Sequence, residues 1–379
     1  MPFFRRAIVA LAMLPALTAP LHAQTSTNAD STCPPATADE RVTLAFDAVE
    51  LVKGNGEVEG SRTLWAAHGK YTYLFKDAAN LAAFKADPAK YEIQWNGACG
   101  RMGPLSGAGS TKLPVVHEGK LYLCASPKCR ETFRKDAARL IEKDDPRPEV
   151  DAASRERALM LLDRAAAAIG KDSAVDSIVT YREVSESTAE SKGKTIAISK
   201  TRTLAFPGRM TERDTWDTYA WGTTVAGADA FQFGSAGAED LAPAQRRAFE
   251  RYCGQSWLAA LRERKSADSV IAPAGEDTVD GVRVQFATVW HDGVSITLGI
   301  SADGRVVCSR YRGRDESLFI ADIEERFSDY REAGPLTVPF ATRVFADGVE
   351  QKSLAWRFSR VDVNPILPPE TFDRPAAPK

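Results

Sequence analysis

The chain has 379 residues, with 49 Lys and Arg against 51 Asp and Glu, a formal net charge of -2, and 44% hydrophobic residues. A nearly neutral chain with no basic block is not the composition of a protein that binds nucleic acid or an anionic membrane surface. The length exceeds one typical hydrophobic core, so we expect a globular protein with two domains.

The first 23 residues have the three parts of a secretory signal peptide. Arg5 and Arg6 form the charged start, residues 7–17 form an apolar run too short to span a bilayer, and Ala23 offers a small residue for cleavage. Cleavage there removes two arginines and no acids, so the net charge goes from -2 to -4. We expect a mature protein in the periplasm, or secreted, without a membrane span.

Two breaks in composition divide the mature chain. Residues 24–38 (QTSTNADSTCPPATA) are small and polar, which is typical of a flexible tether. Pro146 and Pro148 lie in a charged run that cannot continue a helix. The predicted organisation is therefore a signal peptide at 1–23, a tether at 24–38, a domain at 39–145, a linker at 146–152 and a domain at 153–379.

The first domain contains two similar strand–helix patterns. Residues 70–75 (KYTYLF) favour a strand, and Asp77 is a good N-cap for the helix after it. Residues 120–124 (KLYLC) favour a second strand, followed by Ser126 as N-cap and Pro127 at the first helical position. Cys129 then falls in the first helical turn, where the helix dipole favours a thiolate.

The second domain begins with an amphipathic helix and continues mainly as strands. Ser154 precedes the helix and Gly170 ends it. Strands are predicted at 177–184, 195–206 and 210–216, and residues 243–264 predict one helix with a buried stripe: Phe249, Cys253, Trp257 and Leu261.

A recurring Asp-Gly pair is the strongest fold signal in the second domain. It occurs at Asp280-Gly281, Asp292-Gly293, Asp303-Gly304 and Asp347-Gly348, and alternating strands separate the first three pairs. Asp-Gly between such strands is typical of tight hairpin turns. We expect an antiparallel meander.

The six cysteines leave two interpretations open. Cys99-x2-Met102 and Cys124-x4-Cys129 could place three thiols and a thioether around one soft metal ion, with copper preferred and zinc second. In an oxidising compartment, a Cys124–Cys129 disulfide with Cys99 joined to Cys33 or buried free is the alternative. His68 and His117 are weaker ligand candidates. Cys253 and Cys308 form either a bridge or two buried thiols.

The N-terminal domain resembles a known family of small modules. FKDAANLAAFKADPAKY, followed by WNGACGRMG and VVHEGKLYL, is similar to the YHS domain and the TRASH-type heavy-metal-associated fingers, over residues 43–142. The resemblance implies a treble-clef-like fold linked to heavy-metal handling. It also implies Cys99, Cys124 and Cys129 as metal ligands, with Met102 in the place of the methionine of a Cys-Gly-Met motif.

The C-terminal domain resembles lipoprotein-carrier (LolA-like) exported proteins. The segments FSDYREAGPLTVPFATRVFADG and WRFSRVDVNPILPPETFDRP, with the early helix ending in AAAAIG, carry this resemblance over residues 153–376. It implies a half-barrel: an open, curved antiparallel sheet with helices on its concave face, able to hold an acyl chain or another apolar ligand. The alternative is that Trp257 and Phe249 close this face as a packed core.

The expected fold class is α+β, and the expected function is that of an exported binding protein and not an enzyme. GPLSGAGSTK lacks the Gly-Lys-Ser/Thr ending of a phosphate loop, FQFGSAG lacks the first glycine of a nucleophile elbow, and no organic cofactor is implied. The N-terminal domain would bind copper, or another soft metal, and the C-terminal domain an apolar ligand or partner. The alternative is an envelope lipid or lipoprotein carrier whose YHS-like domain is a disulfide-stapled interaction module.

Overall fold

The computed structural model describes residues 41–171, 173–191, 194–217, 219–235 and 237–376. The predicted signal peptide, the tether and Cys33 lie outside these residues. The described chain forms two compact units: an N-terminal unit of residues 41–141, and a C-terminal unit that comprises residues 142–241 and 246–376. No helix in these described ranges is both long and apolar enough to cross a membrane.

The N-terminal unit contains two small sheets with short helices around them. A three-stranded sheet has the order β1-β3-β2, and β4 pairs with β5 in a separate hairpin. The elements are β1 (Val42–Leu44), α2 (Ala48–Lys53), β2 (Ser61–His68), β3 (Tyr71–Phe75), α3 (Ala78–Ala86), α4 (Pro88–Tyr91), η1 (Gln94–Gly97), β4 (Ser110–His117), β5 (Lys120–Cys124), α5 (Pro127–Asp136) and η2 (Ala137–Arg139).

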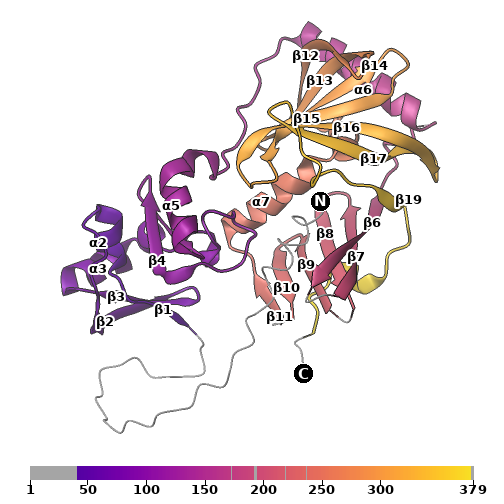
Figure 1. The fold of residues 1–379 in the computed structure, drawn as a ribbon. Helices are drawn as coiled ribbons and strands as arrows, with labels where there is room; N and C mark the ends of the chain where they lie inside the picture. The colour runs from indigo at the N-terminus through magenta and orange to yellow at the C-terminus, as the bar shows by residue number, and fades with distance from the viewer. Residues whose placement is uncertain (1–40, 172, 192–193, 218, 236, 377–379) are drawn as a thin grey trace. The chain divides into compact units, whose positions relative to one another are not determined.

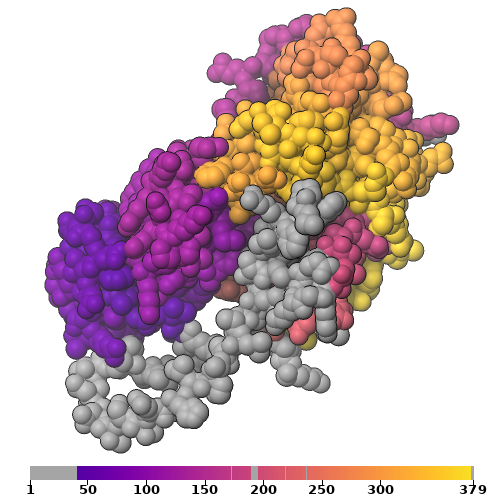
Figure 2. Space-filling model, viewed as in Figure 1, coloured from indigo at the N-terminus to yellow at the C-terminus, as the bar shows by residue number. Residues whose placement is uncertain are grey.

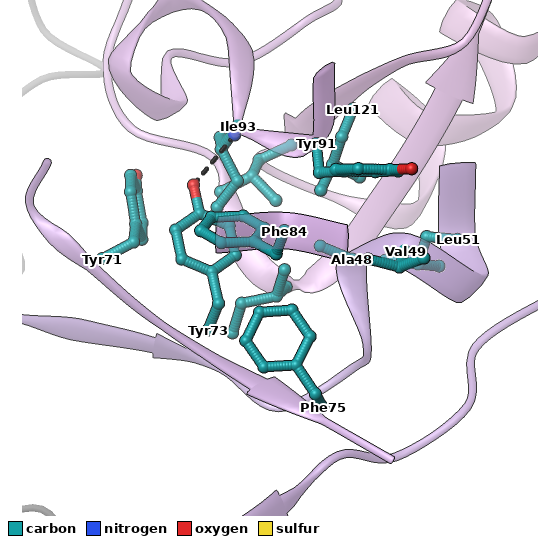
Figure 3. Packing of buried hydrophobic residues seen from close by; sticks show 12 residues of the cluster. Ala48, Val49, Leu51, Tyr71, Tyr73, Phe75, Phe84, Tyr91, Ile93 and Leu121 are labelled. Carbon is teal, nitrogen blue, oxygen red and sulfur yellow. Dashed lines mark hydrogen bonds between the residues drawn. The ribbon is translucent and has the colours of Figure 1, made fainter. Parts of the chain in front are cut away.

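Aromatic side chains form the core of the N-terminal unit (Figure 3). Phe84 of α3 packs against Tyr73 and Phe75 of β3, with ring centroids 4.6 and 5.1 Å apart. The Tyr73 hydroxyl accepts a hydrogen bond of 2.9 Å from the Ile93 backbone N–H. The predicted caps are confirmed: Asp77 accepts from the Asn80 N–H, and Ser126 from the Cys129 N–H.

The C-terminal unit is built on two seven-stranded antiparallel sheets (Figure 1). The first has the order β11-β10-β9-β8-β7-β6-β19 and the second runs from β12 to β18 in sequence order. Its elements are α6 (Ala152–Ile169), β6 (Thr180–Ser191), β7 (Lys194–Ala205), β8 (Arg209–Trp216), β9 (Tyr219–Ala226), β10 (Asp229–Gly234), β11 (Gly237–Asp240), α7 (Pro243–Gly254), α8 (Trp257–Glu263), β12 (Val270–Val279), β13 (Val282–His291), β14 (Val294–Ser301), β15 (Val306–Arg314), β16 (Ile320–Ala333), β17 (Leu336–Ala346), β18 (Val349–Glu350), β19 (Phe358–Val363) and η3 (Pro369–Phe372).

One segment of chain joins the two sheets. The Thr342 N–H of β17 donates to the Trp356 carbonyl at 2.9 Å, and β19, which follows directly, pairs with β6 along Phe358–Val363. Helix α7 lies between the sheets (Figure 1), and in the space-filling view the orange to yellow atoms of the last third of the chain form one continuous surface (Figure 2). The expected α+β class with curved antiparallel strands is confirmed for this unit, but the single half-barrel sheet that was expected is divided into two seven-stranded sheets.

The Asp-Gly pairs close hairpins as predicted. At Asp280-Gly281, Asp292-Gly293 and Asp347-Gly348 both residues have positive φ, which suits tight turns between twisted strands. At Asp303-Gly304 only the glycine does, and the register of β14 and β15 shifts between Gly299 and Ile300. That turn therefore introduces a bulge into the meander.

Two details of the predicted helices are wrong. The helix expected over 243–264 is two helices, because α7 ends at Gly254 and Ser256 begins α8 as an N-cap that accepts from the Ala259 N–H. Helix α6 starts before Ser154, because the Asp151 side chain accepts from the Ser154 N–H and takes the N-cap position. Gly170 ends α6 as predicted, but in an extended conformation in which a Cβ atom would lie 2.4 Å from Leu336.

Candidate functional site

A thiol cluster in the N-terminal unit forms where a loop crosses the end of β5. Cys99 bridges to Leu123, and the Gly100 N–H donates to the Leu123 carbonyl at 2.8 Å. Cys124 is the last residue of β5, and Cys129 lies in the first turn of α5. Strand β5 therefore brings together two cysteines that are 25 positions apart in the sequence.

Hydrogen bonds make Cys99 the thiolate of the cluster. The Cys124 side chain hydrogen-bonds to Cys99 and is the main cause that lowers the pKa of Cys99 to about 5; burial opposes this, and backbone N–H groups assist it. One of these donors is the Ala125 N–H, 3.2 Å from the Cys99 sulfur. The same bond to Cys99, with burial, raises the pKa of Cys124. Cys99 therefore loses its proton more easily than an ordinary cysteine, and Cys124 keeps its proton.

The predicted metal ligands are only partly assembled. Cys129 is near enough for its charge to act on Cys124, whereas Met102 is tied to the cluster through its backbone N–H, 2.9 Å from the Cys99 carbonyl. Across the residues that the structure describes, no three His, Cys, Asp or Glu side chains are grouped as metal ligands. Metal binding by Cys99, Met102, Cys124 and Cys129 stays a prediction.

No disulfide joins the cysteines that the structure describes. Cys99, Cys124, Cys129, Cys253 and Cys308 are all free thiols. The alternative Cys124–Cys129 bridge is therefore not formed, and Cys253 and Cys308 are two separate buried thiols. The histidine candidates have other neighbours: His68 lies 2.8 Å from Glu92, and His117 lies edge-on to Phe133.

A second candidate site is the inner face of the C-terminal unit, the side of the two sheets that α6, α7 and α8 cover. On the second sheet this face is apolar. The ring of Trp257 in α8 packs on Phe327 of β16 at 6.0 Å, and every residue from Trp257 to Leu261 is buried. The buried side chains of β14 on this face are Ile296, Leu298 and Ile300.

On the first sheet the inner face is charged. Glu183, Arg202 and Glu212 lie directly across from one another on β6, β7 and β8. Lys200 and Asp214 form the next row on the same face. The sheet thus carries a ladder of alternating acids and bases.

Helix α7 closes over this ladder with polar contacts. The Tyr252 hydroxyl donates to Glu212 at 2.7 Å, and Lys200 contacts the other oxygen of Glu212 at 2.7 Å. Burial alone would raise the pKa of Glu212, but Lys200, Tyr252 and Arg202 together hold it below its ordinary value. Arg202 donates to Glu183 at 2.8 Å. The carboxylates are buried and mostly paired, as buried charges must be, while the side chain of Lys200 remains 44% exposed.

Sequence reasoning missed this ladder. Its members alternate along predicted strands, in YREV, SKTRTL and MTERDTW, with other side chains between them. Period-two alternation separates the two faces of a strand but does not say which face is covered. The available signal was the spacing of Lys200 and Arg202 against Glu212 and Asp214, two residues apart in both strands.

No protein-family model matches the sequence. A search of curated proteins also finds no match.

Solved structures that resemble the chain cover a little more than half of it. A DUF1329 family protein from Desulfovibrio piger aligns over 58% of this chain and 97% of its own, with a TM-score of 0.36 and 12% identity. A LolA superfamily protein from Nitrosomonas europaea aligns over 57% and 97%, with a TM-score of 0.38 and 13% identity. A domain described as outer membrane lipoprotein-sorting, from Vibrio parahaemolyticus, aligns over 58% and 97%, with a TM-score of 0.34 and 10% identity. Similarity of this extent carries no information about ligands.

Proposed function

We propose that the protein is an exported, non-enzymatic binding protein that holds an apolar ligand on the inner face of its C-terminal unit. The observation that carries this proposal is α8. It has seven residues, of which Trp257 to Leu261 are buried against an apolar sheet face. A helix this short is not stable by itself, so it depends on the surface that it covers.

An apolar ligand can compete with α8 for that surface. Burial of apolar area contributes about 25 cal/mol per Å², whether the covering group is a helix or an acyl chain. Residues 264–269 link α8 to β12, and Gln255 and Ser256 link it to α7. In this proposal α8 shifts on these two links to admit the ligand while the sheets stay in place, and the buried Arg264, which bonds to Asp163 and Asp176, marks the anchored end of the helix. The function is that of a carrier or binder of a lipid, or of an apolar segment of an envelope partner.

The test is binding of a fluorescent fatty-acid probe by the mature chain, with organic extraction of the purified protein to identify bound lipid. Trp257→Ala leaves an apolar cavity beneath α8, and such cavities take up apolar molecules. We expect this variant to bind the probe more tightly than the wild type. Trp65→Ala, at an exposed position of the N-terminal unit, is the matched control. If neither wild type nor folded Trp257→Ala binds the probe, the proposal is overturned.

A second proposal concerns the thiol cluster, and the hydrogen-bonded pair of Cys99 and Cys124 favours it. Reduced thiols with a nearby thioether would suit Cu(I) better than a hard cation. Cys99 and Cys124 would hold the ion, with Cys129 and Met102 as further donors.

A Cu(I) competition titration on the full chain tests it, in reduced and oxidised protein. Cys99→Ser should abolish binding and Met102→Leu should weaken it less, since a thioether adds no charge. Cys308→Ser, a buried thiol elsewhere, should leave it unchanged. Equal Cu(I) binding by the wild type and Cys99→Ser would refute the copper proposal and leave the module as an interaction domain.

A further inference from the structure

Three buried polar atoms lack a hydrogen-bond partner within the described part of the chain: Asp214 Oδ1, Ser309 Oγ and Thr342 Oγ1. The three residues are 8%, 0% and 5% exposed. Buried polar groups in proteins are almost always paired, because an unpaired one loses its hydration without compensation. Three such atoms in one unit therefore need an explanation.

Strand register places all three side chains on the inner face. Asp214 is two residues from Glu212, which bonds to Tyr252 of α7. Ser309 lies across from Leu298, and Thr342 lies across from Phe327, the residue that packs on Trp257. Residues directly opposite in neighbouring strands point to the same side of a sheet. The unpaired atoms thus lie on the face proposed to hold the ligand.

The charged ladder has more acids than bases. It has three carboxyl groups (Glu183, Glu212 and Asp214) and two cations (Lys200 and Arg202), and Glu325 of β16 on the second sheet adds a fourth carboxyl group near Arg202. Lys200 is 3.8 Å from the unpaired oxygen of Asp214, too far for a hydrogen bond, and is bonded to Glu212 instead. Burial raises the pKa values of Asp214 and Glu325. One further cation would balance part of this excess.

An open pocket of about 570 Å³ adjoins the ladder. Among the residues that line it are Ser187, Ile198 and Trp216. By strand alternation these three share the inner face with Lys200 and Asp214 and form the row just beyond them, whereas the other six lining residues alternate to the opposite face, so the pocket lies around the ends of β6, β7 and β8. Asp214 does not line the pocket but lies one row further along β8 from Trp216, which does.

We infer that the ligand is an amphiphile whose polar end carries a primary ammonium group, with its chain on the apolar half of the inner face. This inference rests on the proposed function. An ammonium N–H donates to Asp214 Oδ1 and supplies the missing positive charge. The hydroxyls of Ser309 and Thr342 form hydrogen bonds with any other polar atoms of the natural ligand. A plain fatty acid would add a carboxylate to an interior that already has too many.

The experiment compares ligands that share one dodecyl chain, in displacement of a bound fluorescent probe from the mature chain. Dodecylamine has ammonium N–H donors, dodecyltrimethylammonium has the charge without donors, and dodecanoate is an anion. We expect dodecylamine to bind about tenfold more tightly than either, a difference of about 1.4 kcal/mol.

Asp214→Asn should remove this preference, and Asp229→Asn, at an exposed acid, should keep it. Ser309→Ala and Thr342→Val give a second readout, the melting temperature of the ligand-free protein, which each should raise because each removes an unpaired buried hydroxyl. If all three ligands bind equally, the headgroup inference is overturned while the proposed function stands. A preference that survives in Asp214→Asn also overturns it. If no ligand displaces the probe, the proposed function fails as well.

Discussion

A glycine-to-alanine pair in the meander tests how α6 is seated. Gly304 and Gly348 both follow an Asp at a hairpin turn, with φ of +88° and +80°. A Cβ atom on Gly304 would lie 2.7 Å from Ala168 Cβ and 2.9 Å from the Arg164 carbonyl, both on α6, whereas one on Gly348 would meet nothing within 4 Å. The two substitutions thus share the same backbone strain and differ in the clash.

The magnitudes follow from these two causes. A left-handed conformation costs an alanine about 1–2 kcal/mol relative to glycine. Overpacking against a helix that cannot bend locally adds about 1–3 kcal/mol. Gly348→Ala should therefore lower the free energy of unfolding by about 1–2 kcal/mol, and Gly304→Ala by about 2–5 kcal/mol.

Urea unfolding followed by tryptophan fluorescence measures the difference. Gly281→Ala, with φ of +81° and nothing within 4 Å, is a second control and should match Gly348→Ala. Equal losses in Gly304→Ala and Gly348→Ala would show that α6 does not pack on this turn, and the reasoning would be refuted.

Three further predictions follow from buried polar contacts. The side chain of Arg251 is 5% exposed and contacts Asp145 at 3.3 Å. Arg251→Ala should therefore lower the free energy of unfolding by about 3–5 kcal/mol and make residues 142–151 sensitive to proteolysis. An unchanged digestion pattern would contradict this. Hydrogen bonds from Asn80, Lys76 and Asn55 lower the pKa of Glu50 from 4.5 to about 2. The contribution of Glu50 to the free energy of unfolding is therefore complete above about pH 4.5 and is lost as the pH falls towards 2. In Glu50→Gln, the stability of the N-terminal unit should fall less steeply over this pH range, as measured by unfolding at a series of pH values. Tyr73→Phe removes the hydroxyl that accepts from the Ile93 N–H. It should lower the free energy of unfolding by about 1–3 kcal/mol, measured by thermal unfolding. A decrease of less than about 0.5 kcal/mol would contradict a contribution of this hydrogen bond to stability.

Local signals in the sequence were reliable where a residue acts on its near neighbours. Asp77 and Ser126 cap their helices, and the Asp-Gly pairs close hairpins, because these conformations depend on a few adjacent residues. The same logic failed at Ser154, where Asp151 three residues earlier offered an equally good cap. It failed also at residues 254–256, where a helical stripe continues across a break made by Gly254 and Ser256.

The thiol cluster was predictable as a set of residues but not as a geometry. The spacing of Cys124 and Cys129 followed from a strand end and a helix start, which the sequence predicts. The direct contact of Cys99 with Cys124 depends on a bridge between a loop and β5, which is a tertiary contact. It also contributes to the low pKa of Cys99, since two of the donors to that sulfur, Cys124 at the end of β5 and the Ala125 N–H after it, are brought there by this contact.

The sequence by itself determined the hairpins of the C-terminal unit, the end of α6 at Gly170 and the apolar stripe on α8, because each follows from spacing along the chain. Only the tertiary structure decided which face of each strand turns inward. Glu183, Arg202 and Glu212 alternate with uncharged residues such as Thr203 and Thr211. These threonines are also buried, on the opposite face of the sheet, so alternation alone does not say which face lies under the helices. The charged set lies under α7 because cross-strand pairing and Tyr252 satisfy its charges there. That pairing joins residues about 10 to 40 positions apart, and no local pattern specifies it.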